Sequence, residues 1–87
     1  MEQDLHIITL DQLESGHEGA IVELVDALKG AQRRRLLDMG MTPGTTVRRQ
    51  FNGPMGDPAA FLVRNTTLAL RKSQTKFIKV RVKGSEE

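Results

Sequence analysis

The chain has 87 residues, a net charge of +2 and no cysteine, so we expect one small domain over residues 1–87 and exclude disulfides, thiolate metal sites and cysteine nucleophiles. No apolar run approaches the ~20 residues of a membrane-spanning helix, and the acidic start has neither the basic nor the apolar part of a secretion signal. These features predict a cytoplasmic protein that does not insert directly into a membrane.

The first third of the chain predicts a turn of helix followed by a strand. Thr9 and Gln12 stand at the spacing of a capping box, with Thr9 placed to cap one helical turn and Gln12 to reach back. The segment 19–25, Gly-Ala-Ile-Val-Glu-Leu-Val, is rich in β-branched residues and predicts the first main strand.

Residues 31–39 are the one good helix candidate, because their helix propensities are high and Gly40 stands at a C-cap position. Leu36 and Met39 share one face of this helix, and we expect Met39 to face the core. A helix of about nine residues is marginal alone and depends on packing. Met41-Thr42-Pro43-Gly44 then predicts a turn, since proline presets φ and glycine accepts a positive φ.

The second half predicts short strands separated by turns. Strands are expected at 45–51, 60–63, 68–71 and 77–83, with a Gly/Pro-rich loop at 52–58 and a turn at 65–67. Ser73 is expected to cap a short helical turn, and the last strand points Ile78, Val80 and Val82 inward. Both termini, residues 84–87 included, are expected to fray.

Short strands with tight turns favour closure of the sheet, which removes its edges. We therefore expect an all-β fold, a small barrel of five or six strands with one short helix inserted after the first main strand.

Several segments, in order, resemble the FeoA family of ferrous iron transport accessory proteins. They are Leu10-Asp11-Gln12-Leu13 with Gly16 and the strand from Gly19; Arg34 to Thr45; Gly53-Pro54-Met55-Gly56-Asp57-Pro58, with methionine in the usual leucine position; and Leu68 to Lys72 with Ile78-Lys79-Val80. The resemblance covers about residues 9–82. It implies an SH3-like barrel, the module that also forms the C-terminal domain of metal-dependent repressors of the diphtheria-toxin repressor type.

The resemblance further implies an accessory protein that is not an enzyme and has no cofactor. Its implied partner is FeoB, a ferrous iron permease of the inner membrane with a cytoplasmic G-protein domain, which would recruit this protein to the membrane. Docking would regulate the permease or assemble a complex. The sequence does not decide whether the protein forms a homo-oligomer by exchange of edge strands.

Small barrels often accept extended segments in surface grooves, and we expect such a groove between the segments 54–58 and 39–44. Met41 and Met55 stand beside turns, where partly exposed thioethers would suit an adaptable surface. Asp57 either contacts the partner or hydrogen-bonds its own turn. The expected partner-binding residues are Met39, Met41, Pro54, Met55, Asp57 and Arg71.

Catalytic and metal-binding sites are not expected. The sequence has no nucleophile elbow or phosphate loop, and its two histidines, His6 and His17, match no ligand spacing with nearby carboxylates. The run Arg33-Arg34-Arg35 could supply an arginine to a G-protein active site. Arginines on a short helix are, however, more often solvated or packed along their stems.

Charge is divided unevenly along the chain. Residues 1–28 hold seven acids and no Lys or Arg, whereas residues 29–85 hold all thirteen Lys and Arg and two acids. This indicates either a polyanion-binding face or an acidic N-terminal strand beside basic strands of the same barrel.

A basic face would suit an RNA-binding barrel, which is the alternative function. Against it, the chain lacks Trp and Tyr. Its phenylalanines, Phe51, Phe61 and Phe77, are all expected in the core, which leaves no stacking platform for bases. We therefore expect no nucleic-acid partner.

Overall fold

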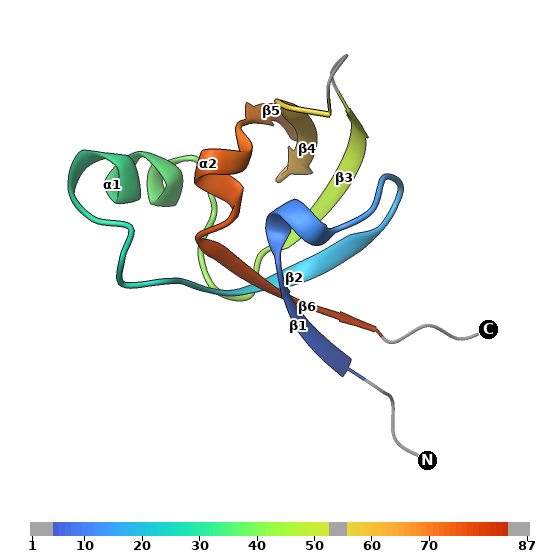
Figure 1. The fold of residues 1–87 in the computed structure, drawn as a ribbon, viewed down its shortest axis with the longest axis horizontal. Helices are drawn as coiled ribbons and strands as arrows, with labels where there is room; N and C mark the ends of the chain where they lie inside the picture. The colour runs from blue at the N-terminus through green and yellow to red at the C-terminus, as the bar shows by residue number, and fades with distance from the viewer. Residues whose placement is uncertain (1–4, 53–55, 84–87) are drawn as a thin grey trace.

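The computed structural model describes residues 5–52 and 56–83. The elements are β1 (Leu5–Thr9), a 3₁₀ turn η1 (Leu10–Gln12), β2 (Glu18–Leu24), α1 (Gly30–Asp38), β3 (Thr46–Asn52), β4 (Ala59–Val63), β5 (Thr66–Leu70), α2 (Lys72–Thr75) and β6 (Ile78–Lys83). The described strands form one antiparallel sheet in the order β1-β6-β2-β3-β4-β5. Figure 1 shows that the sheet bends around α2 and η1, whereas α1 stands beside α2 at the periphery. The expected all-β class, with a short helix after the first main strand, is confirmed. Among the described strands no ladder joins β1 to β5, so the sheet keeps two edges that closure was expected to remove.

Two local predictions differ from the structure. β1 has no counterpart among the expected strands, because it is held by pairing with the distant β6, with Thr9 opposite Lys79. Ser73 does not cap α2, which begins at Lys72 with Arg71 as its N-cap. Gln12 does reach back as expected, and its Oε1 accepts the Thr9 N–H at 3.3 Å. The expected fraying at 84–87 lies outside the described residues.

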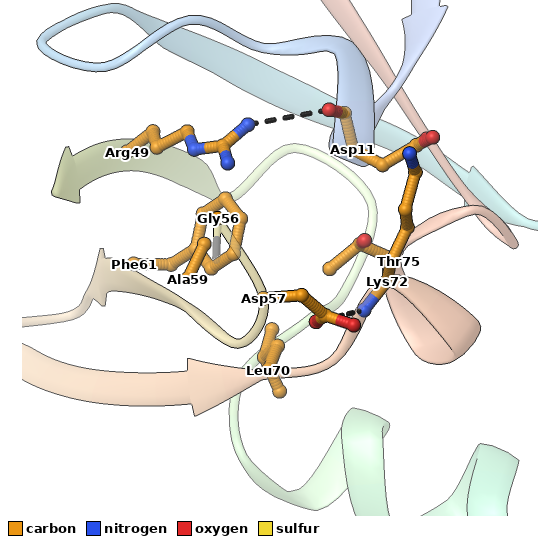
Figure 2. A pocket seen from close by; sticks show the side chains of 9 residues that line it. All are labelled: Asp11, Arg49, Gly56, Asp57, Ala59, Phe61, Leu70, Lys72 and Thr75. Carbon is orange, nitrogen blue, oxygen red and sulfur yellow. Dashed lines mark hydrogen bonds between the residues drawn. The ribbon is translucent and has the colours of Figure 1, made fainter. Parts of the chain in front are cut away.

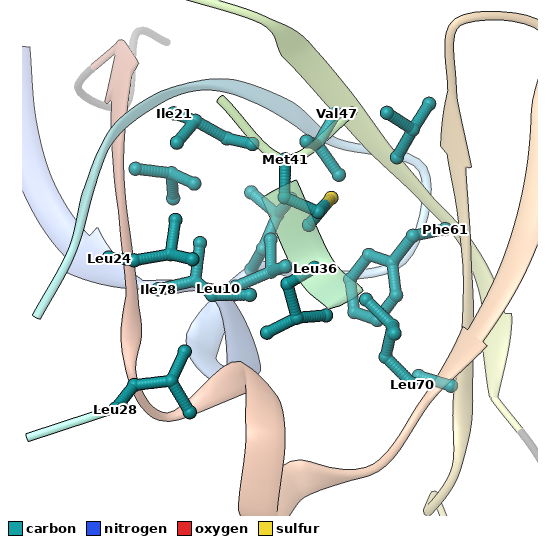
Figure 3. Close-up of a cluster of buried hydrophobic side chains, with 14 residues drawn as sticks. Leu10, Ile21, Leu24, Leu28, Leu36, Met41, Val47, Phe61, Leu70 and Ile78 are labelled. Atoms are coloured by element: carbon teal, nitrogen blue, oxygen red, sulfur yellow. The ribbon is translucent and has the colours of Figure 1, made fainter. Parts of the chain in front are cut away.

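The core lies between the bent sheet and the helical turns (Figure 3). Ile78 and Val80 of β6 are fully buried, and Met39 is partly buried against the core, as the sequence predicts. Leu36 is the residue that α1 buries completely. The buried hydrophobic cluster consists of Leu10, Leu13, Ile21, Leu24, Leu28, Leu36, Met41, Val47, Ala59, Phe61, Val63, Leu70, Ile78 and Val80.

The end of α1 determines which methionine enters the core. Gly40 has φ of +100°, and its N–H donates to Leu37 O at 3.0 Å. The N–H of Met41 donates to Leu36 O at 3.1 Å, which completes a Schellman motif. This motif folds Met41 back against the helix, and its side chain is 0% exposed. The expected partial exposure of Met41 is therefore wrong.

An irregularity in β3 moves one phenylalanine out of the core. The register between β3 and β4 shifts between Arg49 and Phe51. One extra residue turns the following side chains to the opposite face, so Phe51 is 63% exposed and its expected core position is wrong. Phe61 is buried and Phe77 partly buried, as predicted.

Candidate docking groove

The arginine run on α1 divides into one structural and two exposed side chains. Arg33 Nη1 donates at 3.2, 3.0 and 3.1 Å to the carbonyl oxygens of Leu24, Val25 and Leu28. These carbonyls belong to the end of β2 and the link to α1, so Arg33 fixes the helix to the sheet. Arg34 and Arg35 are exposed.

Two further arginines also bind within the fold. Arg49 Nη1 donates to Leu13 O at 2.6 Å, and the guanidinium lies 5.7 Å from the ring centroid of Phe61. Arg64 Nη2 donates to the hydroxyls of Thr42 and Thr45 at 3.3 and 3.1 Å. Both side chains therefore hydrogen-bond to turns of the fold, although Arg64 is itself exposed.

The acidic strand β2 lies between the basic strands β3 and β6. Glu18 forms an ion pair with Arg48 at 3.7 Å, and Glu23 forms one with Lys79 at 3.6 Å. The charge asymmetry of the sequence is therefore partly balanced by pairing across strands.

Two surface hollows lie between α1 and the strand β5, which is at one end of the sheet order. Each holds about 510 Å³, and Met39 lines both. We call the pair the β5 groove. Its first hollow is lined by Leu37, Asp38, Met39, Gly40, Thr42, Val63, Arg64, Thr66 and Leu68. Its second hollow is lined by Gln32, Arg35, Met39, Pro58, Ala69, Leu70, Arg71, Ser73 and Gln74.

The groove unites two of the residues that the sequence singles out as partner contacts, Met39 and Arg71. Met41 is in the core, and Pro54 and Met55 lie outside the described residues. Arg35 also lines the groove but is not among the predicted partner contacts. The spacing of Gln32, Arg35 and Met39 places all three on one helix face and could have indicated it.

The Asp57 side chain hydrogen-bonds to the start of α2, which is a different element from the turn that contains Asp57. Its Oδ1 accepts the backbone N–H of Lys72, the first residue of α2, at 2.8 Å (Figure 2). Asp57 therefore supplies the side-chain acceptor for the start of α2. Both residues border a small cavity of about 60 Å³, which Asp11, Arg49 and Thr75 also line.

The described ranges, 5–52 and 56–83, contain no cluster of three or more His, Cys, Asp or Glu residues that could hold a metal ion. His17 lies at the surface, 3.8 Å from Glu14. None of the helices in these ranges is long and apolar enough to span a membrane.

The sequence matches the FeoA domain family over residues 8–82, close to the range expected from its motifs. Among solved structures, the FeoA-like protein of Clostridium acetobutylicum is 32% identical with a TM-score of 0.81, over 100% of this chain and 95% of that chain. The zinc complex of Stenotrophomonas maltophilia FeoA, a prokaryotic SH3 domain protein, is 32% identical with a TM-score of 0.75, over 84% of this chain and 88% of that chain. A search of curated proteins found no match.

A manganese-dependent transcriptional repressor shares the fold alone, at 15% identity and a TM-score of 0.75, over 97% of this chain and 44% of that chain. These similarities confirm the predicted SH3-like fold class.

Proposed function

Because the chain belongs to the FeoA family, which is associated with ferrous iron transport, we propose that it docks onto a membrane ferrous iron permease of the FeoB type and regulates or assembles it. Residues 1–87 act as one cytoplasmic domain, which reaches the inner membrane through the permease and neither inserts nor catalyses a reaction. The S. maltophilia relative is itself proposed as a ferrous iron transport activating factor.

The observation that carries this proposal is the β5 groove. It joins a sheet edge to a short helix, and Met39 borders both of its hollows. A flexible thioether can repack against different aliphatic side chains, and a groove beside an edge strand suits an extended segment. We propose Met39 and Arg71 as contacts, with Pro58, Thr66 and Leu68 along the same groove.

The RNA-binding alternative has weaker support. Arg48 and Lys79 each face an acid on β2, and Phe61 is buried. Phe51 is exposed, but one aromatic side chain is a small platform for stacking bases. Docking of a protein segment therefore explains the surface better.

The test is an amide NMR titration of the labelled protein with the soluble G-protein domain of the permease from the same organism, and then with the full-length permease in lipid nanodiscs. We expect saturable shifts at Met39, Thr66, Leu68 and Arg71. Ferrous iron alone and an RNA oligonucleotide serve as controls. The proposal fails if neither permease preparation shifts these amides.

The variant M39A should weaken this binding, and I7A is its matched control. Ile7 is an apolar side chain that is 50% exposed, and it lies on β1 at the other end of the sheet order from the groove. Equal loss of binding in the two variants would place the contact outside the groove.

A further inference from the structure

We propose that the β5 groove takes an extended acidic segment of the partner, which adds as a strand to β5 and places a carboxylate between Arg35 and Arg71. This inference rests on the proposed docking function and specifies the chemistry of the docked segment.

The outer edge of β5 offers backbone groups for a new strand. Val63 stands opposite Thr66, and the two turn residues between them have φ of 51° and 67°, as in a type I′ hairpin. The pair that flanks such a turn is hydrogen-bonded, and hydrogen-bonded pairs alternate along the ladder. Thr67 and Ala69 therefore direct their N–H and C=O groups away from β4. No described strand pairs with that edge.

The charges of the side chains that line the second hollow indicate which kind of partner segment it binds. Arg35 comes from α1 and Arg71 from the junction of β5 and α2, and both line the second hollow. Both are exposed, and within the described ranges neither guanidinium has a hydrogen bond or an ion pair. This distinguishes them from Arg33 and Arg64, whose side chains are bound within the fold.

Within residues 5–52 and 56–83, no Asp or Glu lines the second hollow. The charged residues of this described lining, Arg35 and Arg71, are thus both positive, and the polar groups of Gln32, Ser73 and Gln74 surround them. A guanidinium binds a carboxylate through two parallel N–H donors. The hollow therefore fits an Asp or Glu side chain better than a neutral or basic one.

The apolar part of the groove sets the spacing within the segment. Met39 and Leu70 lie in the same hollow as these two arginines, together with Pro58. Side chains two positions apart in a strand point to the same side. We therefore expect the docked segment to carry an aliphatic residue two positions from its acid.

The experiment compares R35E and R71E with R34E, using the full-length permease in nanodiscs and short overlapping peptides from its cytoplasmic segments. Arg34 is the matched control because it is exposed on the same helix but does not line the groove. We expect R35E and R71E each to weaken binding about tenfold, and R34E about twofold or less. A Glu→Lys or Asp→Lys change in the bound peptide should restore binding to R71E.

Hydrogen exchange of the complex tests strand addition separately. The amides of Thr67 and Ala69 should become protected on binding, whereas that of Leu68 already faces β4. Unchanged exchange at Thr67 and Ala69 would overturn strand addition.

The outcomes separate this inference from the proposed function. If the wild-type protein binds but R34E loses as much affinity as R71E, the acidic anchor is wrong and docking stands. If the wild-type protein binds neither the permease nor any peptide, the proposed function fails and the inference falls with it. Specific loss in R35E and R71E, with rescue by the reversed peptide, supports both.

Discussion

At the scale of single residues, Arg33 occupies the link between β2 and α1, where its guanidinium donates to three carbonyls. Removing it leaves half-buried acceptors without their charged donor, so R33A should lower the free energy of unfolding by about 1–3 kcal/mol. R34A should change it by less than about 0.5 kcal/mol, because Arg34 is exposed. Urea unfolding of the two variants checks this, and equal losses would contradict a structural role for Arg33.

The arginine run also shows what a sequence can and cannot assign. Successive helical residues are rotated by about 100°, so Arg33, Arg34 and Arg35 must point in different directions. The pattern therefore predicts different environments for them. The acceptors of Arg33 belong to a non-helical link, and no periodicity reveals where those carbonyls lie.

Truncation to alanine should affect mainly stability at Met41 and mainly docking at Met39. Met41 is 0% exposed in the core, so M41A should cost about 2–5 kcal/mol of unfolding free energy. Met39 is only partly buried and lines the groove, so M39A should cost clearly less stability but weaken docking. Urea unfolding and permease titration of both variants test this, and M39A would refute it by destabilising as much as M41A.

At the scale of elements, Asp57 connects the loop before β4 to the start of α2 through the Lys72 N–H. D57A should destabilise the protein by about 0.5–2 kcal/mol, the usual effect of removing a helix-capping acceptor. D57N retains an oxygen acceptor and should lose less. Thermal unfolding, with faster exchange of the Lys72 amide in D57A, measures the effect.

The matched control for this contact is D38A. Asp38 is also an exposed aspartate, and its side chain has no hydrogen bond or ion pair within the described ranges. If D38A destabilises the protein as much as D57A, the loss of a negative charge and not the contact with α2 would explain the result.

The elements differ in how far the sequence predicts them. Strand β6 follows from its alternation, and Gly40 with its positive φ follows from the pattern at the end of α1. The exposure of Phe51 depends on a register shift that only pairing with β4 determines. β1 is equally non-local, because β6 comes from the other end of the chain. The groove forms where α1 lies beside the edge of β5. The position of Met39 directly after α1 could suggest it as a groove residue, but the sequence does not show that Met39 and Arg71 line the same hollow.

At the scale of the whole molecule, the acids of β2 weaken the field of the basic strands beside them. Glu18 and Glu23 pair with Arg48 and Lys79, and all four side chains are about half exposed. Such pairs contribute little stability, typically 0–1 kcal/mol, so their effect on surface potential matters more. Their removal should expose the basic face that the RNA-binding alternative requires.

We therefore expect E18Q/E23Q to bind an RNA oligonucleotide several-fold more tightly than the wild type at low salt, and to lose this gain at physiological salt. Its unfolding free energy should stay within about 1 kcal/mol of the wild type, and permease docking should be unchanged because neither residue lines the groove. Fluorescence anisotropy measures the affinities for the RNA oligonucleotide and for the permease.

The control E14Q/D26N makes the same change in net charge at acids that face no Lys or Arg among the described ion pairs. If it gains as much RNA affinity, net charge and not the pairing along β2 governs that affinity; if E18Q/E23Q gains none, the basic strands form no latent polyanion site.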